Sequence, residues 1–316
     1  MWKEKLDKEK RKIADHIAID DRWNRTTVRY EFASHLKYYI KKGKCPPMMS
    51  NAYLKCWELL QLVERDVDWS GEIRHFDNAA LPGDFIRATR DWVKRRDMQY
   101  DWRASSLIDP NDNTVLTDRF GLLKNHPECW MMLPEGKQDL PDRGVMGDVC
   151  DAKVRAHIVK RLAPMKVNLY TSDLGFKFED RFNEEGEHYA ANVGQIELGL
   201  ACLDVGGVFI TKQFGMFNVE TQDLIKKCAS RFKKFMIIKP ETSKADNSEM
   251  YLVGIGFLGM DVEPRAINID FDAQIEAFSY AQVRKIRSNL QMYKSGRRAP
   301  NMQPQIKQWI NKNRWY

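Results

Sequence analysis

The feature that most constrains this chain is an alternation of strand-like and helix-like segments between residues 72 and 257. The expected strands are residues 73–76, 101–107, 166–171 and 208–211, and the expected helices are 85–93, 152–162, 190–203 and 221–230. Alternation of this kind is typical of a parallel sheet with crossover helices on its faces. Two further apolar runs, 235–238 and 250–257, predict an antiparallel pair at the sheet edge. The sequence therefore predicts an α/β fold.

The 316 residues allow one large domain or two small ones. The expected parts are a helical extension at 1–49, the α/β domain at 50–260 and a basic helical segment at 261–316. Ser50 is a suitable N-cap for a helix that contains Lys55. Residues 109–146 are rich in Pro, Asn, Asp and Gly and predict a long irregular insertion.

The composition argues against membrane insertion, secretion and a metal site. No apolar run approaches the roughly 18–20 residues that cross a bilayer, and the charged start Met-Trp-Lys-Glu-Lys has no apolar signal core behind it. The six cysteines form no Cys-x-x-Cys pair, and no histidine stands at zinc-finger spacing. We therefore expect no membrane association, no metal and no disulfide framework, in a reducing compartment.

The positive charge gathers near the C-terminal end. Residues 277–316 hold nine Lys or Arg and no acid, which exceeds the net charge of +7 of the whole chain. Aromatic residues are interleaved with these cations, namely Tyr293, Trp309, Trp315 and Tyr316. Cations that pair with phosphates and rings that stack on bases suit a nucleic-acid partner. A solvated helical face or a flexible tail fits the same pattern.

A turn of small residues follows the first expected strand and opens a helix. Its candidate ligand-binding residues are Asn78, Ala80, Leu81, Pro82, Gly83, Asp84 and Phe85. Small side chains let a ligand approach the backbone, and a nucleoside cofactor commonly binds at such a turn. The turn lacks the Gly-x-Gly-x-x-Gly pattern, which disfavours a dinucleotide. An ordinary turn without a ligand is the alternative interpretation.

Asp148 follows the irregular insertion and precedes an expected helix. A carboxylate there could accept a hydrogen bond from an exocyclic amine such as that of adenine. It could equally be the N-cap of the helix that begins near Ala152. The local sequence leaves the two interpretations open.

Four charged residues have predictable positions although they are far apart in the sequence. Asp173 and Lys212 end consecutive strands of one expected βαβ unit, so their side chains should be neighbours at the carboxyl edge of the sheet. Lys55 lies on an expected helix, and Glu249 opens the last strand. Each could be a solvated surface charge, but the set of four favours an active site at the sheet edge.

The segment at 239–253 identifies a family resemblance. It reads Lys-Pro-Glu-Thr-Ser-Lys-Ala-Asp-Asn-Ser-Glu-Met-Tyr-Leu-Val, and it resembles the FtsJ-type ribose 2′-O-methyltransferases, which combine Lys-Pro, Ser-Arg, a further Ser and a Glu before Tyr and aliphatic residues. Residues 50–257 carry the resemblance. Within the family the chain is most similar to the cap methyltransferases of large cytoplasmic DNA viruses, the African swine fever type in particular.

The resemblance assigns roles to the candidate residues. It implies a Rossmann-like, S-adenosylmethionine-dependent methyltransferase sheet with helices on both faces and an antiparallel edge hairpin. The catalytic residues that it implies are Lys55, Asp173, Lys212 and Glu249. Asp148 would bind the adenine, and the turn at 78–85, Ser105 and Asp173 would complete the S-adenosylmethionine site. The family usually has Gly where this chain has Asp84, which places an acid near the amino-acid end of the cofactor.

The implied reaction is methylation of the first transcribed nucleotide of capped mRNA, from cap 0 to cap 1. The alternatives are a ribosomal or transfer RNA 2′-O-methyltransferase, and a non-catalytic RNA-binding or processivity subunit. Lys212 is expected to act as the base or to stabilise the alkoxide. General-base catalysis would require its pKa to fall from about 10.4 to roughly 7–8. Asp173 and Glu249 are expected to fix the geometry and compensate buried charge.

The RNA-binding residues are assigned from the same resemblance and from the basic tail. They are Lys239, Ser243, Lys244, Arg284, Arg287, Arg297 and Arg298. The family usually has Arg where this chain has Lys244, so the bidentate fork of a guanidinium is absent. The expected location is the cytoplasm of an infected host cell and also the virion, or the nucleus for a cellular protein. Other capping or polyadenylation subunits are expected partners.

Overall fold

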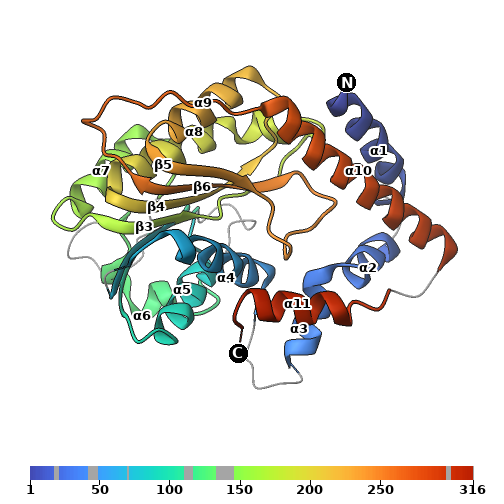
Figure 1. Ribbon diagram of the computed structural model, residues 1–316, viewed down its shortest axis with the longest axis horizontal. Helices are drawn as coiled ribbons and strands as arrows, with labels where there is room; N and C mark the ends of the chain where they lie inside the picture. Colours follow the sequence, from blue (N-terminus) through green and yellow to red (C-terminus); the bar gives the residue numbers. More distant parts are fainter. Residues whose placement is uncertain are drawn as a thin grey trace.

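Six strands form a mixed sheet at the centre of the described chain, which the computed structural model covers at residues 1–17, 21–41, 49–69, 71–109, 117–132, 146–296 and 300–315 (Figure 1). The strands are β1 (Glu72–Asn78), β2 (Gln99–Ser105), β3 (Val167–Ser172), β4 (Leu203–Phe214), β5 (Phe232–Ile238) and β6 (Glu249–Phe257). Their order across the sheet is β2-β1-β3-β4-β6-β5. The first four strands are parallel, and β6 runs antiparallel to both β4 and β5. The predicted α/β sheet with an antiparallel edge pair is confirmed.

Helices cover both faces of the sheet (Figure 1). On one face lie α4 (Asn51–Val63) and α5 (Asp84–Lys94), and on the other α7 (Ala152–Leu162), α8 (Glu184–Cys202) and α9 (Val219–Ala229). Successive side chains along a strand point to opposite faces of the sheet, so each strand contributes to the core on both faces. Leu169 belongs to the core beneath α4, whereas the next residue, Tyr170, packs beneath α8. Three short helices lie between these elements in the sequence: the 3-10 helices η1 (Glu64–Asp66) and η2 (Pro127–Cys129), and the α-helix α6 (Leu122–Asn125).

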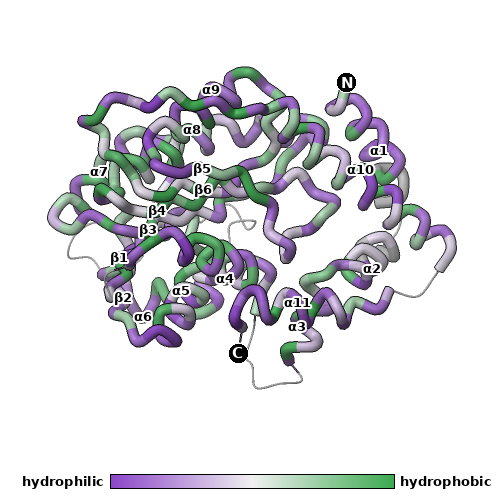
Figure 2. The backbone as a smooth tube through the Cα atoms, viewed as in Figure 1, coloured by the Kyte–Doolittle hydropathy of each residue, from purple (hydrophilic) through white to green (hydrophobic). Residues whose placement is uncertain are grey.

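The two ends of the chain pack against the domain and against each other. The N-terminal helices are α1 (Trp2–Ile17), α2 (Asp21–Arg29) and α3 (Phe32–Lys41), and the C-terminal ones are α10 (Phe271–Ser295) and α11 (Gln303–Lys312). Leu6 of α1 shares a small core with Ile286 and Leu290 of α10, and Figure 1 shows the two helices side by side. In Figure 2 the central strands carry long hydrophobic stretches, whereas α1 is mostly hydrophilic.

The C-terminal aromatics correct one expectation. Trp309 and Trp315 are buried in the core beneath α4, and Trp315 lies edge-on to Trp57 with ring centroids 4.9 Å apart. They cannot stack on bases in this arrangement. The tail is therefore partly a structural element of the core, because its aromatic residues cover α4. Tyr316 lies outside the described residues.

Several strand boundaries also differ from the sequence expectation, among them the ends of β4 and β2. β4 continues beyond residue 211 to Phe214, because its last residues pair with the start of β6, with Lys212 opposite Tyr251. Lys212 thus lies within a strand and not after it. β2 ends at Ser105, two residues earlier than expected. Across the described ranges no helix is both long and apolar enough to span a bilayer.

Candidate active site

A cavity of about 330 Å³ lies at the point where the chain order of the sheet reverses. The chain moves from β1 to β2 on one side and from β3 to β4 on the other, so the carboxyl ends of β1 and β3 are neighbours. Open α/β sheets bind ligands at such a switch point. The cavity is lined by Asn78, Ala79, Leu81, Ser106, Leu107, Gly147, Asp148, Val149, Cys150, Asp173, Leu174, Gly175, Phe176, Lys177 and Ala191.

Part of the predicted cofactor set lines this cavity. Asn78, Leu81, Asp148 and Asp173 do so. Ala80, Pro82, Gly83, Asp84, Phe85 and Ser105 do not. The chain enters α5 at Asp84, directly after the turn, and Ser105 is the last residue of β2.

Two contacts show where Gly83 and Asp84 are directed. Gly83 has φ +108°, and a Cβ there would meet Leu122 Cδ1 at 2.2 Å, so its small size serves packing against α6. The carboxylate of Asp84 pairs with Arg87 at 3.3 Å. It is therefore held by α5 and does not line the cavity as the sequence interpretation expected.

Asp148 is not the N-cap of α7. That role belongs to Asp151, whose side chain accepts from the backbone N–H of Lys153 at 2.7 Å. Asp148 accepts from the backbone N–H of Cys150 at 2.8 Å and lines the cavity. Of the two interpretations left open by the sequence, the helix cap is thus wrong, and the carboxylate is available to a ligand.

Several lining residues were not predicted from the sequence. Leu107 and Phe176 are hydrophobic side chains that are 39% and 47% exposed at the cavity, which suits the face of an aromatic ligand. Gly175 also lines it, and a Cβ there would lie 2.7 Å from Lys212 Nζ. The available signal was the glycine two residues after Asp173, which keeps the backbone close to the lysine.

Lys55, Asp173, Lys212 and Glu249 meet in one cluster. Lys55 Nζ donates to both carboxylate oxygens of Glu249 at 3.1 Å and lies 3.5 Å from Asp173 Oδ1. Lys212 Nζ lies 3.2 Å from the same Oδ1 and donates to the main-chain oxygen of Asp173 at 2.8 Å. Asp173 is therefore shared by the two lysines, and it belongs to the cavity as well.

The charges of the cluster stabilise one another. Burial opposes the charged form of Lys55, but Asp173 and Glu249 outweigh it and raise the pKa of this ammonium. Burial opposes the charged form of both carboxylates too, yet the neighbouring lysines lower the pKa of Asp173, with Lys212 the larger influence, and Lys55 lowers that of Glu249. The site therefore holds ionised carboxylates near neutral pH.

Two hydroxyl groups fix the carboxylates. Tyr251 donates to Asp173 Oδ1 at 2.5 Å, and Ser243 donates to Glu249 Oε1 at 2.5 Å. Neither contact was predicted. Tyr251 follows Glu249 by two residues on β6, so both side chains point to the same face of the sheet.

The predicted RNA-binding residues are distributed differently from the expectation. Lys239 donates to the main-chain oxygens of Asn247 and Glu249 at 2.9 and 2.6 Å, so its ammonium, like the hydroxyl of Ser243, is engaged inside the protein. Burial lowers the pKa of Lys239 to about 8. The other described candidates lie on the surface: Lys244 pairs with Glu31, Arg287 pairs with Glu9, and Arg284 is exposed. Arg297 and Arg298 lie outside the described residues.

Among the residues that the structure describes, no three His, Cys, Asp or Glu side chains are grouped in a way that could hold a metal ion.

Comparison with known proteins shows which proteins this chain resembles. Residues 131–257 match the model of the FtsJ-like methyltransferases. A probable methyltransferase of African swine fever virus is 31% identical over 215 residues, which cover 66% of this chain and 49% of the relative. The cap-specific mRNA (nucleoside-2′-O-)-methyltransferase 2 of Mus musculus is 27% identical over 259 residues, which cover 77% of this chain and 32% of the relative. An uncharacterized protein of Acanthamoeba polyphaga mimivirus is 24% identical, with 75% of this chain and 30% of the relative covered. The chain spans about half or less of the length of these relatives.

Proposed function

We propose that this chain, which carries an FtsJ-like methyltransferase domain, transfers the methyl group of S-adenosylmethionine to a ribose 2′-hydroxyl of RNA. One observation carries the proposal: Asp173 lines the cavity and is also bonded to the lysines of the charged cluster. A ligand in the cavity and a ribose hydroxyl at Lys212 would therefore lie on either side of Asp173.

The cavity residues fit S-adenosylmethionine in their chemistry. Asp148 and Asp173 supply carboxylates for an amine and an ammonium, Asn78 supplies an amide, and Leu107 and Phe176 supply apolar surface for a purine. The absence of a side chain at Gly175 keeps the space beside Lys212 open. When bound, the cofactor would supply an electrophilic methyl group on a sulfonium.

The protein's own groups would hold the ribose and manage its proton. In the transfer, the hydroxyl oxygen forms a bond to the methyl carbon while the carbon–sulfur bond breaks, and the hydroxyl proton must leave. Lys212 is the group we assign to that oxygen, either to take the proton or to stabilise the developing negative charge. Asp173 fixes the direction of the Lys212 ammonium through its main-chain oxygen, and Lys55 with Glu249 compensates the buried charge.

The substrate we propose is capped mRNA, methylated at the first transcribed nucleotide. The supporting observation is the similarity to a mouse protein named as a cap-specific mRNA 2′-O-methyltransferase. Viral relatives support a viral origin, with the cytoplasm of the infected cell or the virion as the location. Capping or polyadenylation subunits are the partners we propose.

The decisive experiment is a methyl-transfer assay with tritiated S-adenosylmethionine and three RNAs: a cap 0 transcript, the same transcript uncapped, and a structured ribosomal fragment. We expect label on the cap 0 RNA, located by nuclease digestion and mass spectrometry at the 2′-oxygen of the first nucleotide. Label on the uncapped or structured RNA would instead show a ribosomal or transfer RNA enzyme. RNA binding without transfer would show a non-catalytic subunit and refute the proposal.

A further inference from the structure

The turn at 246–249, which delivers the catalytic carboxylate of Glu249, is held by donors from three separate elements. Lys239 at the end of β5 donates to the main-chain oxygen of Glu249 at 2.6 Å. Gln282 of α10 donates to the main-chain oxygen of Asp246 at 3.0 Å. Lys10 of α1 donates to the hydroxyl of Ser248 at 3.1 Å. Two of the three donors thus come from helices at the ends of the chain, outside the segment that matches the family model.

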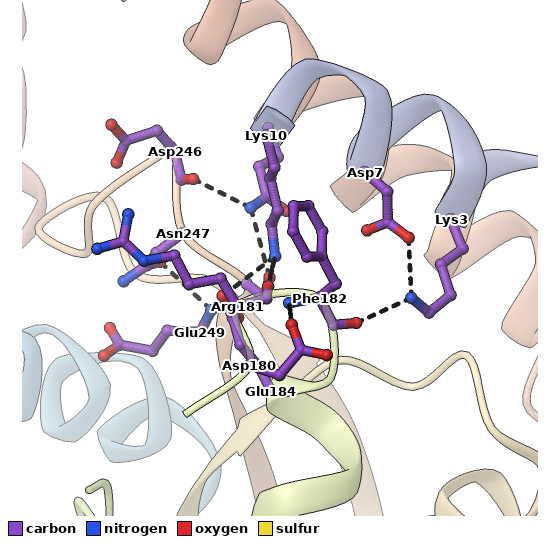
Figure 3. Close-up of polar contacts among 12 residues, drawn as sticks. Lys3, Asp7, Lys10, Asp180, Arg181, Phe182, Glu184, Asp246, Asn247 and Glu249 are labelled. Carbon is purple, nitrogen blue, oxygen red and sulfur yellow. Dashed lines mark hydrogen bonds and ion pairs between the residues drawn. The ribbon is translucent and has the colours of Figure 1, made fainter. Parts of the chain in front are cut away.

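Lys10 also reaches the segment that follows Asp173. Its ammonium pairs with Glu184 at 3.1 Å and contacts the main-chain oxygen of Arg181 at 3.4 Å. Figure 3 shows Lys10 extending from α1 to Arg181 and Glu184, with Asp246, Asn247 and Glu249 beside them. One ammonium therefore joins the two chain segments that flank the catalytic cluster, the one after Asp173 and the one before Glu249.

The position of this ammonium makes the contact stronger than an ordinary surface ion pair. The side chains of Lys10 and Glu184 are 15% and 13% exposed, so water screens them only in part. A second lysine of the helix, Lys3, donates to the main-chain oxygen of Phe182 at 3.0 Å. The helix itself is anchored by its small apolar core with α10. Its docking thus rests on the two catalytic segments and on the C-terminal helix together.

We infer that Lys10 is a positioning residue for the reaction, through which the N-terminal helix α1 sets the place of Glu249 relative to Asp173. The inference rests on the proposed methyl transfer, because only that reaction gives the four-residue cluster its task. Glu249 holds Lys55, and Lys55 in turn contacts Asp173. A shift of the 246–249 turn would therefore move the carboxylate of Glu249 and, through Lys55, disturb that of Asp173. Misplacement of reacting groups by about 1 Å can cost on the order of 100-fold in rate.

The test compares three variants of the full-length chain. Lys10→Met removes the ammonium, Lys10→Arg keeps a cation with several donors, and Lys8→Met removes a charge from an exposed position of the same helix. The measurements are kcat, KM for RNA, the Kd of S-adenosylhomocysteine by calorimetry, and hydrogen exchange of the amides at 239–250.

For Lys10→Met we expect kcat to fall on the order of 10- to 100-fold, with KM for RNA and the Kd of S-adenosylhomocysteine nearly unchanged. The amides around the 246–249 turn should exchange faster. Lys10→Arg should restore most of kcat, and Lys8→Met should leave kcat as in the wild type. An undiminished kcat in Lys10→Met, or an equal loss in Lys8→Met, would overturn the inference.

Hydrogen exchange separates this inference from the proposed function. If the wild-type chain transferred no methyl group to any RNA, the proposed function would fail, and the exchange of the turn would decide whether Lys10 positions it. Unchanged exchange in Lys10→Met would then refute the positioning role. Should Lys10→Met not fold, Ser248→Ala replaces it, because it removes the acceptor on the turn and leaves α1 intact; an unaltered kcat and exchange there would equally refute the role.

Discussion

At the residue scale, Lys212 can be separated from the cavity that we propose for the cofactor. Its ammonium contacts both the main chain and the carboxylate of Asp173, but Lys212 does not line the cavity. We therefore expect Lys212→Ala to lower kcat at least about 100-fold, the smallest usual contribution of a positioned proton-transfer group. Binding of S-adenosylhomocysteine should change little. A tritium-transfer assay and calorimetry measure the two quantities.

The matched control is Lys234→Ala, which removes an exposed lysine from β5 and should keep wild-type kcat. If Lys212→Ala retained near-normal turnover on the best RNA substrate, Lys212 would not act on the ribose hydroxyl. A large loss of S-adenosylhomocysteine binding would show that the lysine belongs to the cofactor site.

Residue types and their order predicted that four charged side chains gather at the sheet edge, but not the direction of every side chain. Asp173 and Lys212 could be expected together because the ends of neighbouring parallel strands meet at one edge of a sheet, and the family resemblance added Lys55 and Glu249. Ser105 was the predicted cofactor residue, but Ser106 lines the cavity, since neighbouring residues of an extended chain point to opposite sides. Lys239 and Ser243 were predicted to contact RNA. In the structure Lys239 donates to the main-chain oxygen of Glu249 and Ser243 donates to its carboxylate, and only the tertiary structure can show such contacts.

At the element scale, the segment between β5 and β6 is fixed to α4 at two points. Lys55 of α4 bonds to Glu249, and Glu58, three residues further along the same helix, accepts from the backbone N–H groups of Glu241 and Thr242 at 2.7 and 3.2 Å. The same carboxylate accepts from the indole of Trp309 in α11 at 3.2 Å. Helix α4 thus carries one lysine of the charged cluster and also anchors the segment that leads to Glu249.

Replacing Glu58 with Gln should test this anchor. The amide that replaces one carboxylate oxygen would face a donor, and a buried donor without a partner costs about 1–3 kcal/mol, with more lost for a charged acceptor. We expect the free energy of unfolding, measured with urea, to fall by about 2–4 kcal/mol.

Glu64→Gln is the control, because Glu64 lies just after α4 and pairs with Arg96 in a more exposed position. Its loss should cost at most about 1 kcal/mol. Equal destabilisation by the two substitutions would show that the contacts of Glu58 have no special weight.

The elements inside the sheet were more predictable than those that pack on it from the chain ends. α7 was predicted with its observed bounds, because polar and turn residues mark both of its ends. β4 was predicted too short at both ends; at its carboxyl end Lys212 and Gln213 are polar, and they belong to the strand because they pair with β6. The burial of Trp309 in α11 was not predicted, because its neighbours in the sequence are mostly lysines and glutamines and do not indicate that the ring packs against α4.

At the scale of the whole molecule, the basic charge and the folded tail must be considered together. Deleting residues 281–316 would not test RNA binding, because it would also remove Ile306, Trp309 and Trp315 from the core. Point substitutions avoid this problem. Lys244 and Arg284 suit them, because both are solvent-exposed and both belong to the surface proposed to bind RNA.

Neutralising Lys244 and Arg284 together with Gln should therefore reduce the salt dependence of RNA binding and leave the fold intact. Each phosphate contact on single-stranded RNA contributes about 0.7 to the slope of log K against log salt. Loss of both contacts should make the slope shallower by about 1.4 in a binding titration over a salt series. The charge-matched control is Lys153→Gln with Lys160→Gln, both exposed on α7, which lies across the molecule from α10 (Figure 1). A slope that changed equally in the two pairs would mean that RNA senses the net charge of the protein. An unchanged slope in the Lys244 and Arg284 pair would exclude this surface from the RNA path.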